Sequence, residues 1–301
     1  MIAAVYNQYG PPEVLQVKQV EKPMPKKNEI LLRIRATAVN SGDWRLRKAD
    51  PFAVRFIFGL IRPKINILGS VFSGEVESVG EDVKHFKVGD LVFGHTDMSL
   101  GSYAEYKCLP ENASMAIKPA NISHNEAAVI PFGGVTALHF LKKANIKPGQ
   151  KVLVVGASGA VGSAAVQLAK SFGADVTGVC STANIALVKS IGADKVIDYT
   201  KEDFNQSGET YDVIFDTVKA ISVSRSIKSL NNNGIMVLSA AGVSEMLQGL
   251  WISMTSNKKV MTGVISHEAA DIILIKELIE TGKFKPVIDR TYPLEQIVEA
   301  H

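Results

Sequence analysis

Residues 152–170 read VLVVGASGAVGSAAVQLAK, an apolar run followed by three glycines at three-residue spacing and then by small residues. This order is typical of a buried strand, a tight loop and a helix. In such a loop the first glycine makes the turn, the second lets the backbone approach a pyrophosphate, and the third lets helix and strand pack closely. Amide groups at the helix start would face the phosphates. The predicted contacts are Gly156, Ser158, Gly159, Ala160, Val161 and Gly162.

A glycine-rich turn that holds no ligand is the alternative, and the sequence after the loop argues against it. Short, almost uniformly apolar runs alternate there with helical segments, as expected for parallel strands buried on both faces. Six such strands predict an α/β fold with a doubly wound parallel sheet, the Rossmann architecture that binds dinucleotides. The strand candidates are KVLVVG (151–156), DVTGVC (175–180), KVIDY (195–199), DVIFDT (212–217), GIMVLSA (234–240) and KVMTGVI (259–265).

The first part of the chain has a different pattern, with short β-type runs such as IAAVY (2–6) and ILLRIRATAV (30–39) separated by turn residues. We predict a mostly antiparallel β-domain over residues 1–120, a dinucleotide-binding domain over 121–266 and a C-terminal segment over 267–301 that leads away from the sheet and returns towards the first domain. Within the second part, NEAAVIPFGGVTALHFLKKA (125–144) predicts two helices separated by a break at Gly133-Gly134.

The bulk composition limits the partners. Of the 301 residues 46% are hydrophobic, and 33 basic and 30 acidic side chains leave a formal net charge of +3. This composition gives no electrostatic footprint for nucleic acid or a membrane surface, so a small molecule is the expected partner. The start MIAAVYNQYG has no leader pattern, and we expect a cytoplasmic protein. Cys108 and Cys180 are too few for a disulfide framework or a cysteine zinc cluster.

The type of dinucleotide is indicated about 20 residues beyond the loop, where an acidic residue would bind the adenosine ribose. Cys180, Ser181 and Thr182 stand there instead. Because a carboxylate would repel a 2′-phosphate and hydroxyl groups can donate to one, we predict NADPH. Tyr199 either flanks the adenine and its phosphate or packs at a strand end. Further cofactor contacts are assigned to the ends of later strands: Thr217, Val218, Ala240 and Val264.

Several blocks occur in order along the whole chain: GPPEVL (10–15), RATAVNSGDWRLR (35–47), GEVESVGEDVKHFKVGDLVFG (74–94), AAVIPFGGVTALHFL (127–141), the glycine loop and IGADKVIDY (191–199). Together they resemble the medium-chain dehydrogenase/reductase superfamily, in its zinc-independent, zeta-crystallin-like quinone oxidoreductase branch. The resemblance implies a GroES-like β-domain before the Rossmann domain, bound NADPH, an active site between the two and a homodimer. It also implies a final strand after residue 301, so we expect the last segment to be truncated or to lack this element.

The resemblance further implies that no metal is bound. Zinc alcohol dehydrogenases of this superfamily place catalytic ligands at positions that match Asn40, Ser70, Val71 and Phe132 in this sequence. None of these residue types is a usual zinc ligand. Without a Lewis acid, a quinone or an enone is the better hydride acceptor, because charge spreads from the attacked carbon onto a distant oxygen.

Three residues are our catalytic candidates, each with a structural alternative. Asn40 is expected near nicotinamide or substrate, or else as a turn residue. Asp43 is expected to bond a cofactor or substrate hydroxyl group, or else to cap a helix. Thr136 matches a position that the family uses beside the nicotinamide, or else it is a buried threonine. Four nearby aromatic residues are expected to line the substrate site, or else to lie in the core or in a dimer contact: Trp44, Phe52, Phe56 and Phe58.

These observations predict an NADPH-dependent oxidoreductase that reduces quinones or α,β-unsaturated carbonyl compounds by direct hydride transfer. No acid–base pair is recognisable in the sequence, so we expect the proton to come from solvent. The alternatives are a carbonyl or alcohol dehydrogenase that works without zinc, and a non-catalytic NADPH-binding protein.

Overall fold

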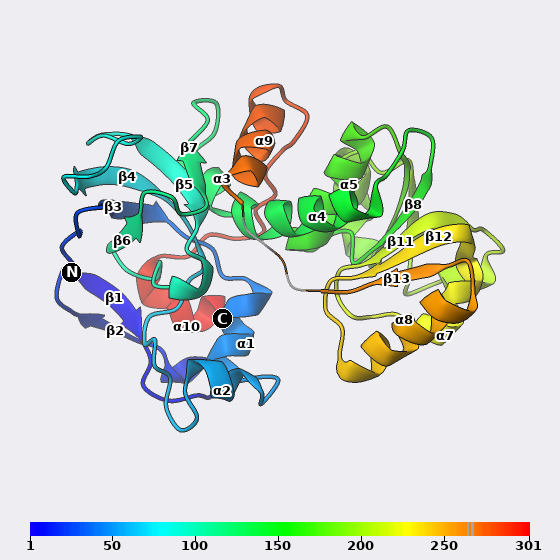
Figure 1. The fold of residues 1–301 in the computed structure, drawn as a ribbon, viewed down its shortest axis with the longest axis horizontal. Helices are drawn as coiled ribbons and strands as arrows, with labels where there is room; N and C mark the ends of the chain where they lie inside the picture. Colours follow the sequence, from blue (N-terminus) through cyan, green and yellow to red (C-terminus); the bar gives the residue numbers. More distant parts are fainter. Residues whose placement is uncertain (264, 266–267) are drawn as a thin grey trace. The chain divides into compact units, whose positions relative to one another are not determined.

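The computed structural model describes residues 1–263, 265 and 268–301, which form two compact units (Figure 1). Unit 1 comprises Met1–Phe132, His267–Glu280 and Pro286–His301, and unit 2 comprises Gly133–Ser266 and Thr281–Lys285. The predicted first boundary is at residue 120. The structure places it later, because the helix α3 (His124–Ala128) packs against the β-sheet of unit 1.

Unit 2 contains the predicted six-stranded sheet, which is confirmed. The strand order is β10-β9-β8-β11-β12-β13, and all neighbouring strands are parallel. The order reverses between β8 and β11, which is the switch point where open α/β sheets bind ligands. The strands are β8 (Lys151–Val155), β9 (Asp175–Cys180), β10 (Lys195–Asp198), β11 (Tyr211–Asp216), β12 (Leu230–Leu238) and β13 (Lys259–Met261).

The helices of unit 2 follow the strands as crossovers. The core between helices and sheet is formed by aliphatic residues such as Leu153, Ile214 and Met236, all fully buried. The helices are α5 (Ala160–Ser171), α6 (Ile185–Ser190), α7 (Val223–Ser226) and α8 (Val243–Thr255), preceded by α4 (Ile130–Ala144), which begins in unit 1.

The break predicted at Gly133-Gly134 is wrong, because α4 runs through both glycines without interruption. The interruption lies earlier, at Val129 between α3 and α4. Gly133 has another use. A Cβ atom at this position would lie 2.1 Å from the carbonyl oxygen of Ala160, so the glycine lets α4 lie directly against the start of α5.

Unit 1 is mostly antiparallel, as predicted. A five-stranded sheet has the order β6-β3-β4-β5-β7, and β1 pairs with β2 in a separate ribbon. Its strands are β1 (Ile2–Val5), β2 (Gln16–Gln19), β3 (Glu29–Ala36), β4 (Val71–Val79), β5 (Leu91–His95), β6 (Tyr106–Pro110) and β7 (Met115–Ile117). Its other helices are α1 (Ser41–Lys48), α2 (Val54–Phe58), α9 (Ala269–Glu280) and α10 (Ile297–Ala300). Within the described residues, none of the helices is long and apolar enough to cross a bilayer.

Candidate functional site

The glycine loop joins β8 to α5 and is shaped by two of its glycines. Gly156 has φ +80°, a conformation that favours glycine, and its amide donates to the Val179 carbonyl at 3.1 Å. A Cβ atom on Gly162 would lie 2.0 Å from the carbonyl oxygen of Gly156. Both positions therefore need glycine for reasons internal to the chain: the turn at Gly156 and the close helix–strand contact at Gly162.

Gly159 is different, because nothing in the described chain requires a glycine there. Its φ of −76° and ψ of 172° suit any residue, and an added Cβ atom would meet only the Gly156 carbonyl oxygen, at 3.5 Å. Gly159 precedes α5, and among the described residues no side chain caps this helix. The backbone amide groups of the first turn of α5 are thus available to bind an anion or water. Because Gly159 has no side chain, the space beside these amide groups stays open. This arrangement fits a dinucleotide pyrophosphate.

The ends of neighbouring strands surround the loop. Thr217, after β11, donates its hydroxyl group to the Val155 carbonyl at 2.8 Å, and the adjacent Val218 is half-exposed beside Gly156. Ala240, after β12, is half-buried. The structure thus brings Thr217 and Val218 to the loop, as a cofactor site requires. Val264 lies outside the described residues.

A carboxylate that the sequence pattern does not reveal lies beside the end of β9, on the neighbouring strand β10. Asp198 ends β10 and pairs in register with Cys180. Its carboxylate accepts hydrogen bonds from the hydroxyl groups of Thr182 at 2.5 Å and Thr200 at 2.7 Å. These hydrogen bonds lower the pKa of Asp198 to about 2, and the bond from Thr182 has the largest effect. The Thr182 hydroxyl group therefore donates within the chain, and the nearby Lys201 ammonium lies 3.6 Å from the same carboxylate.

Two other groups at this edge keep donor capacity for a phosphate. The Ser181 oxygen accepts a hydrogen bond from the Asn184 amide at 3.2 Å, which leaves the hydroxyl hydrogen for another acceptor. Tyr199 is 64% exposed, so its ring is not a core residue. Of the polar groups predicted to recognise the 2′-phosphate, Ser181 and Tyr199 therefore fit better than Thr182.

In unit 1, Asn40 and Asp43 form the cap of α1. The side-chain oxygen of Asn40 accepts from the backbone amides of Gly42 at 2.9 Å and Asp43 at 3.3 Å, and the Asp43 carboxylate accepts from the Asn40 backbone amide at 3.3 Å. The side-chain amide of Asn40 donates to the Ser70 hydroxyl oxygen at 2.8 Å. The polar atoms of Asn40 are thus used within the chain, as in the structural alternative. Its catalytic role stays a prediction.

Asp43 is completely buried. Its Oδ2 accepts a hydrogen bond from the Tyr103 hydroxyl group at 2.9 Å, whereas its Oδ1 has no hydrogen-bond partner within the described chain. Burial raises the pKa of this carboxyl group to about 7, against the opposing effect of the Tyr103 hydrogen bond. Asp43 can therefore exist in both protonation states near neutral pH. Such a group is suited to proton transfer or to a structural role that depends on pH.

The positions that match zinc ligands lie close together in unit 1. Asn40 and Ser70 share a hydrogen bond, and Cε2 of Phe132 lies 3.6 Å from where a Gly42 side chain would begin. Across the described residues, His, Cys, Asp and Glu form no group of three that could hold a metal. What the chain offers at these positions is an amide, a hydroxyl group and a phenyl ring, a donor set unlike that of zinc sites.

The remaining candidates are distributed between the units. Thr136 is buried within α4 in unit 2. In unit 1, Phe58 is buried in the core, whereas Phe52 and Phe56 are exposed and contact each other edge to face. The core interpretation of the aromatic residues thus holds for Phe58 and fails for Phe52 and Phe56.

Two family models match the chain: an alcohol dehydrogenase GroES-like domain over residues 26–119 and a zinc-binding dehydrogenase over residues 191–301. The chloroplast envelope quinone oxidoreductase homolog of Arabidopsis thaliana is 34% identical over 324 residues, covering 100% of this chain and 93% of that protein. The chloroplastic NADPH-dependent alkenal/one oxidoreductase of the same plant is 31% identical over 312 residues, covering 100% of this chain and 75% of that protein.

Solved structures agree with these matches. The quinone oxidoreductase from Coxiella burnetii superposes with a TM-score of 0.90 at 29% identity, covering 100% of this chain and 94% of that chain. An NAD-dependent alcohol dehydrogenase superposes with a TM-score of 0.85 at 30% identity, covering 99% of this chain and 94% of that chain. The similarity therefore extends over both units and is not limited to the Rossmann sheet.

Proposed function

The chain belongs to the medium-chain dehydrogenase/reductase superfamily, in its quinone oxidoreductase branch, and we propose that it is a zinc-independent, NADPH-dependent reductase of quinones or α,β-unsaturated carbonyl compounds. Membership makes it an NAD(P)H-dependent oxidoreductase. The observation that carries the proposal is the loop of unit 2, where α5 has no side-chain cap and Gly159 leaves space that the chain does not use. Bound there, the cofactor supplies hydride to the acceptor.

The proposal of zinc independence rests on the chemistry of the matched ligand positions. Zinc in this kind of site needs thiolate, imidazole or carboxylate ligands. Asn40 and Ser70 instead bond to each other, and Phe132 has no donor atom. A saturated ketone would thus lack a Lewis acid to polarise it, whereas a conjugated acceptor delocalises the charge that hydride addition creates.

Acceptor-dependent oxidation of NADPH by the purified protein tests this proposal. We expect turnover with simple quinones and with α,β-unsaturated ketones, little turnover with the matched saturated ketones, and no loss of activity on treatment with a chelator. Turnover confined to saturated carbonyl compounds would point to a carbonyl dehydrogenase instead. Tight cofactor binding without turnover on any acceptor would indicate a non-catalytic protein.

The preference for NADPH over NADH is also part of the proposal. It is supported by the absence of an acidic residue at the end of β9 and by the available donors Ser181 and Tyr199. Asp198 is ionised, and the Lys201 ammonium group 3.6 Å away offsets part of its repulsion of a 2′-phosphate. In the same assay we expect a lower KM for NADPH than for NADH, and equal KM values would contradict this part of the proposal.

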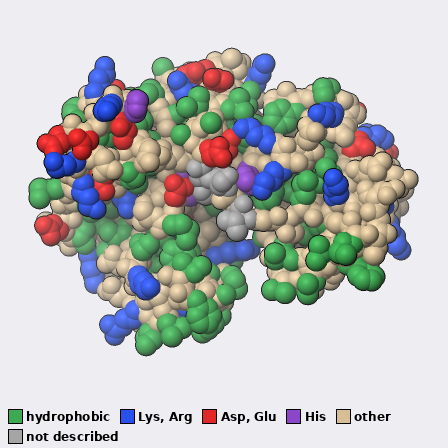
Figure 2. All heavy atoms as spheres, viewed as in Figure 1, with side chains coloured by type: hydrophobic (Ala, Val, Ile, Leu, Met, Phe, Trp, Pro, Cys, Tyr) green, Lys and Arg blue, Asp and Glu red, His purple; other side chains and the backbone are tan. Residues whose placement is uncertain are grey.

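We further propose that unit 2 forms a homodimer through β13 and α8. The strand β13 lies at one edge of the sheet, and α8 packs beside it. Figure 2 shows hydrophobic side chains gathered over α8, where Leu247, Leu250 and Trp251 are largely exposed. Edge-to-edge pairing of two β13 strands about a two-fold axis would cover both the open backbone groups and these apolar faces.

The mass of the protein in solution tests the dimer. We expect light scattering to give the mass of two chains for the unaltered protein and of one chain for the double variant Leu247→Glu/Trp251→Glu. The double variant Phe52→Glu/Phe56→Glu, which alters exposed apolar residues of unit 1, is the matched control and should remain dimeric. A single-chain mass for the unaltered protein at micromolar concentration would refute the interface.

A further inference from the structure

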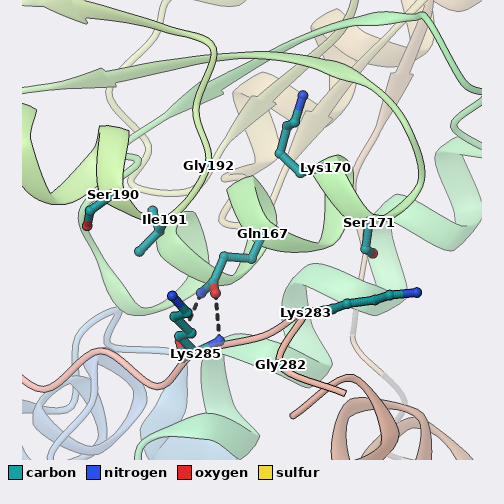
Figure 3. Close-up of a pocket in the computed structure, with 9 residues that line it drawn as sticks. All are labelled: Gln167, Lys170, Ser171, Ser190, Ile191, Gly192, Gly282, Lys283 and Lys285. Carbon is teal, nitrogen blue, oxygen red and sulfur yellow. Dashed lines mark hydrogen bonds between the residues drawn. The ribbon is translucent and has the colours of Figure 1, made fainter. Parts of the chain in front are cut away.

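A pocket of about 440 Å³ lies in unit 2 at the carboxyl end of α5 (Figure 3). Three separate segments line it: the last part of α5, the end of α6 with the two residues after it, and the segment 282–285. Because α5 rises about 1.5 Å per residue, the part of α5 that lines the pocket, Gln167 to Ser171, lies about 12 to 18 Å along the helix from Gly159. It is thus separate from the proposed cofactor site. The lining residues are Gln167, Lys170, Ser171, Ser190, Ile191, Gly192, Gly282, Lys283 and Lys285.

Hydrogen bonds of a buried glutamine hold the walls of the pocket together. The Gln167 side-chain oxygen accepts from the Lys285 backbone amide at 2.7 Å, and its side-chain amide donates to the Lys285 carbonyl at 3.0 Å. Phe284 is also buried, which places Lys283 and Lys285 on the outer side of the segment. Figure 3 shows their side chains extending in different directions from it. The backbone of Lys285 is therefore held against α5, and Lys283 lies two residues before it.

The charged residues that line the pocket are all basic. Lys170 is neutralised by Asp194, whose two carboxylate oxygens lie 2.9 and 2.8 Å from its ammonium group. Within the described part of the chain, no carboxylate forms an ion pair with Lys283 or Lys285, and no acidic residue is among those lining the pocket. The lining thus includes two exposed lysines that have no carboxylate partner among the described residues.

We propose that this pocket binds a small organic polyanion, one that carries at least two phosphate or carboxylate groups. Lysine ammonium groups are strong donors to such oxygens and can adjust to different spacings. The volume is within the range of small-molecule pockets and exceeds what a single inorganic phosphate needs.

A structural alternative exists for the same lysines. Both α5 and α6 end at this pocket, and cations near the carboxyl end of a helix offset its dipole. If that were their only role, their removal would lower the melting temperature and would not alter the binding of an anion. The experiment must therefore measure both quantities.

Calorimetric titration of the full-length protein, saturated with NADPH so that the glycine loop is occupied, tests the proposal. The probes are inorganic pyrophosphate and citrate, which separate phosphate from carboxylate ligands. We expect at least one to bind, and the double variant Lys283→Ala/Lys285→Ala to weaken it about tenfold, as expected for the loss of two partly exposed charge pairs. Added salt should weaken binding by the unaltered protein.

The double variant Lys64→Ala/Lys228→Ala removes the same charge from exposed positions outside the pocket and should bind the probe as the unaltered protein does. The proposal is overturned if neither probe binds at millimolar concentration, or if both double variants weaken binding equally. It is also overturned if the pocket variant lowers only the melting temperature.

Discussion

Replacing Gly159 by alanine is expected to weaken NADPH binding by about tenfold or more, which corresponds to about 1.4 kcal/mol, while the melting temperature of the cofactor-free protein stays nearly constant. The added methyl group meets only the Gly156 carbonyl oxygen within the chain, at an ordinary contact distance of 3.5 Å. The backbone at Gly159 already has a conformation that alanine adopts freely. The methyl group would nevertheless occupy the space over the uncapped helix start, where the pyrophosphate is expected.

Gly162→Ala is the matched control, because its effect should appear in the protein itself. The new Cβ atom would lie 2.0 Å from the Gly156 carbonyl oxygen, a backbone atom that cannot move without distorting the loop. We expect a loss of about 1–3 kcal/mol in the free energy of unfolding, as in other overpacked sites. Thermal melting and titration of NADPH fluorescence measure the two effects. If Gly159→Ala bound NADPH with unchanged affinity, the phosphates would not lie over this loop.

The role of a glycine could be predicted from the sequence only where its reason lies within a few residues. The spacing of Gly156, Gly159 and Gly162 predicted the turn and the close contact, because both depend on neighbours within a few residues. Gly133 was misread as a helix break, since the reason for it is Ala160, which is distant in sequence. A glycine that serves a distant contact has the same local pattern as one that ends a helix.

The hydrogen bonds of the polar site residues were likewise predictable only where both partners are close in sequence. The six strands of unit 2 were predictable, because strands buried on both faces are apolar along their whole length. That Asp198 would accept the hydroxyl hydrogen of Thr182 depends on the pairing of β10 with β9, which neither segment reveals alone. The sequence allowed a capping role for Asp43 and a turn role for Asn40, and in the structure the two residues, three positions apart, cap α1 together.

The buried carboxyl group of Asp43 should make the stability of unit 1 depend on pH. In the folded protein its pKa is raised from 3.8 to about 7, chiefly by burial. The folded state thus binds this proton more tightly than the unfolded state does. The contribution to stability is complete below about pH 4 and is lost as the pH rises to about 7, with a slope of up to about 1.4 kcal/mol per pH unit.

Other titrating groups face the same cluster and must be separated from Asp43. Tyr103 donates to it, and His301 contacts the Tyr103 ring and accepts a hydrogen bond from Arg47. Burial lowers the pKa of His301 to about 4, so its contribution is lost as the pH falls from its ordinary 6.5 towards 4, opposite in sign to that of Asp43. In the unaltered protein the two effects partly cancel between pH 4 and 6.5.

Comparison with Asp43→Asn separates the two effects, because asparagine keeps an oxygen acceptor for Tyr103 and does not titrate. The free energy of unfolding is measured by denaturant titration from pH 5 to 8 and compared between the two proteins at each pH. The contribution of His301 is present in both proteins and therefore cancels in the difference. We expect the stability of the unaltered protein relative to the variant to fall by about 1.4 kcal/mol per pH unit between pH 5 and 7 and then to level off. Parallel curves across this range would mean that Asp43 is ionised throughout, and would remove it as a source of protons near neutral pH.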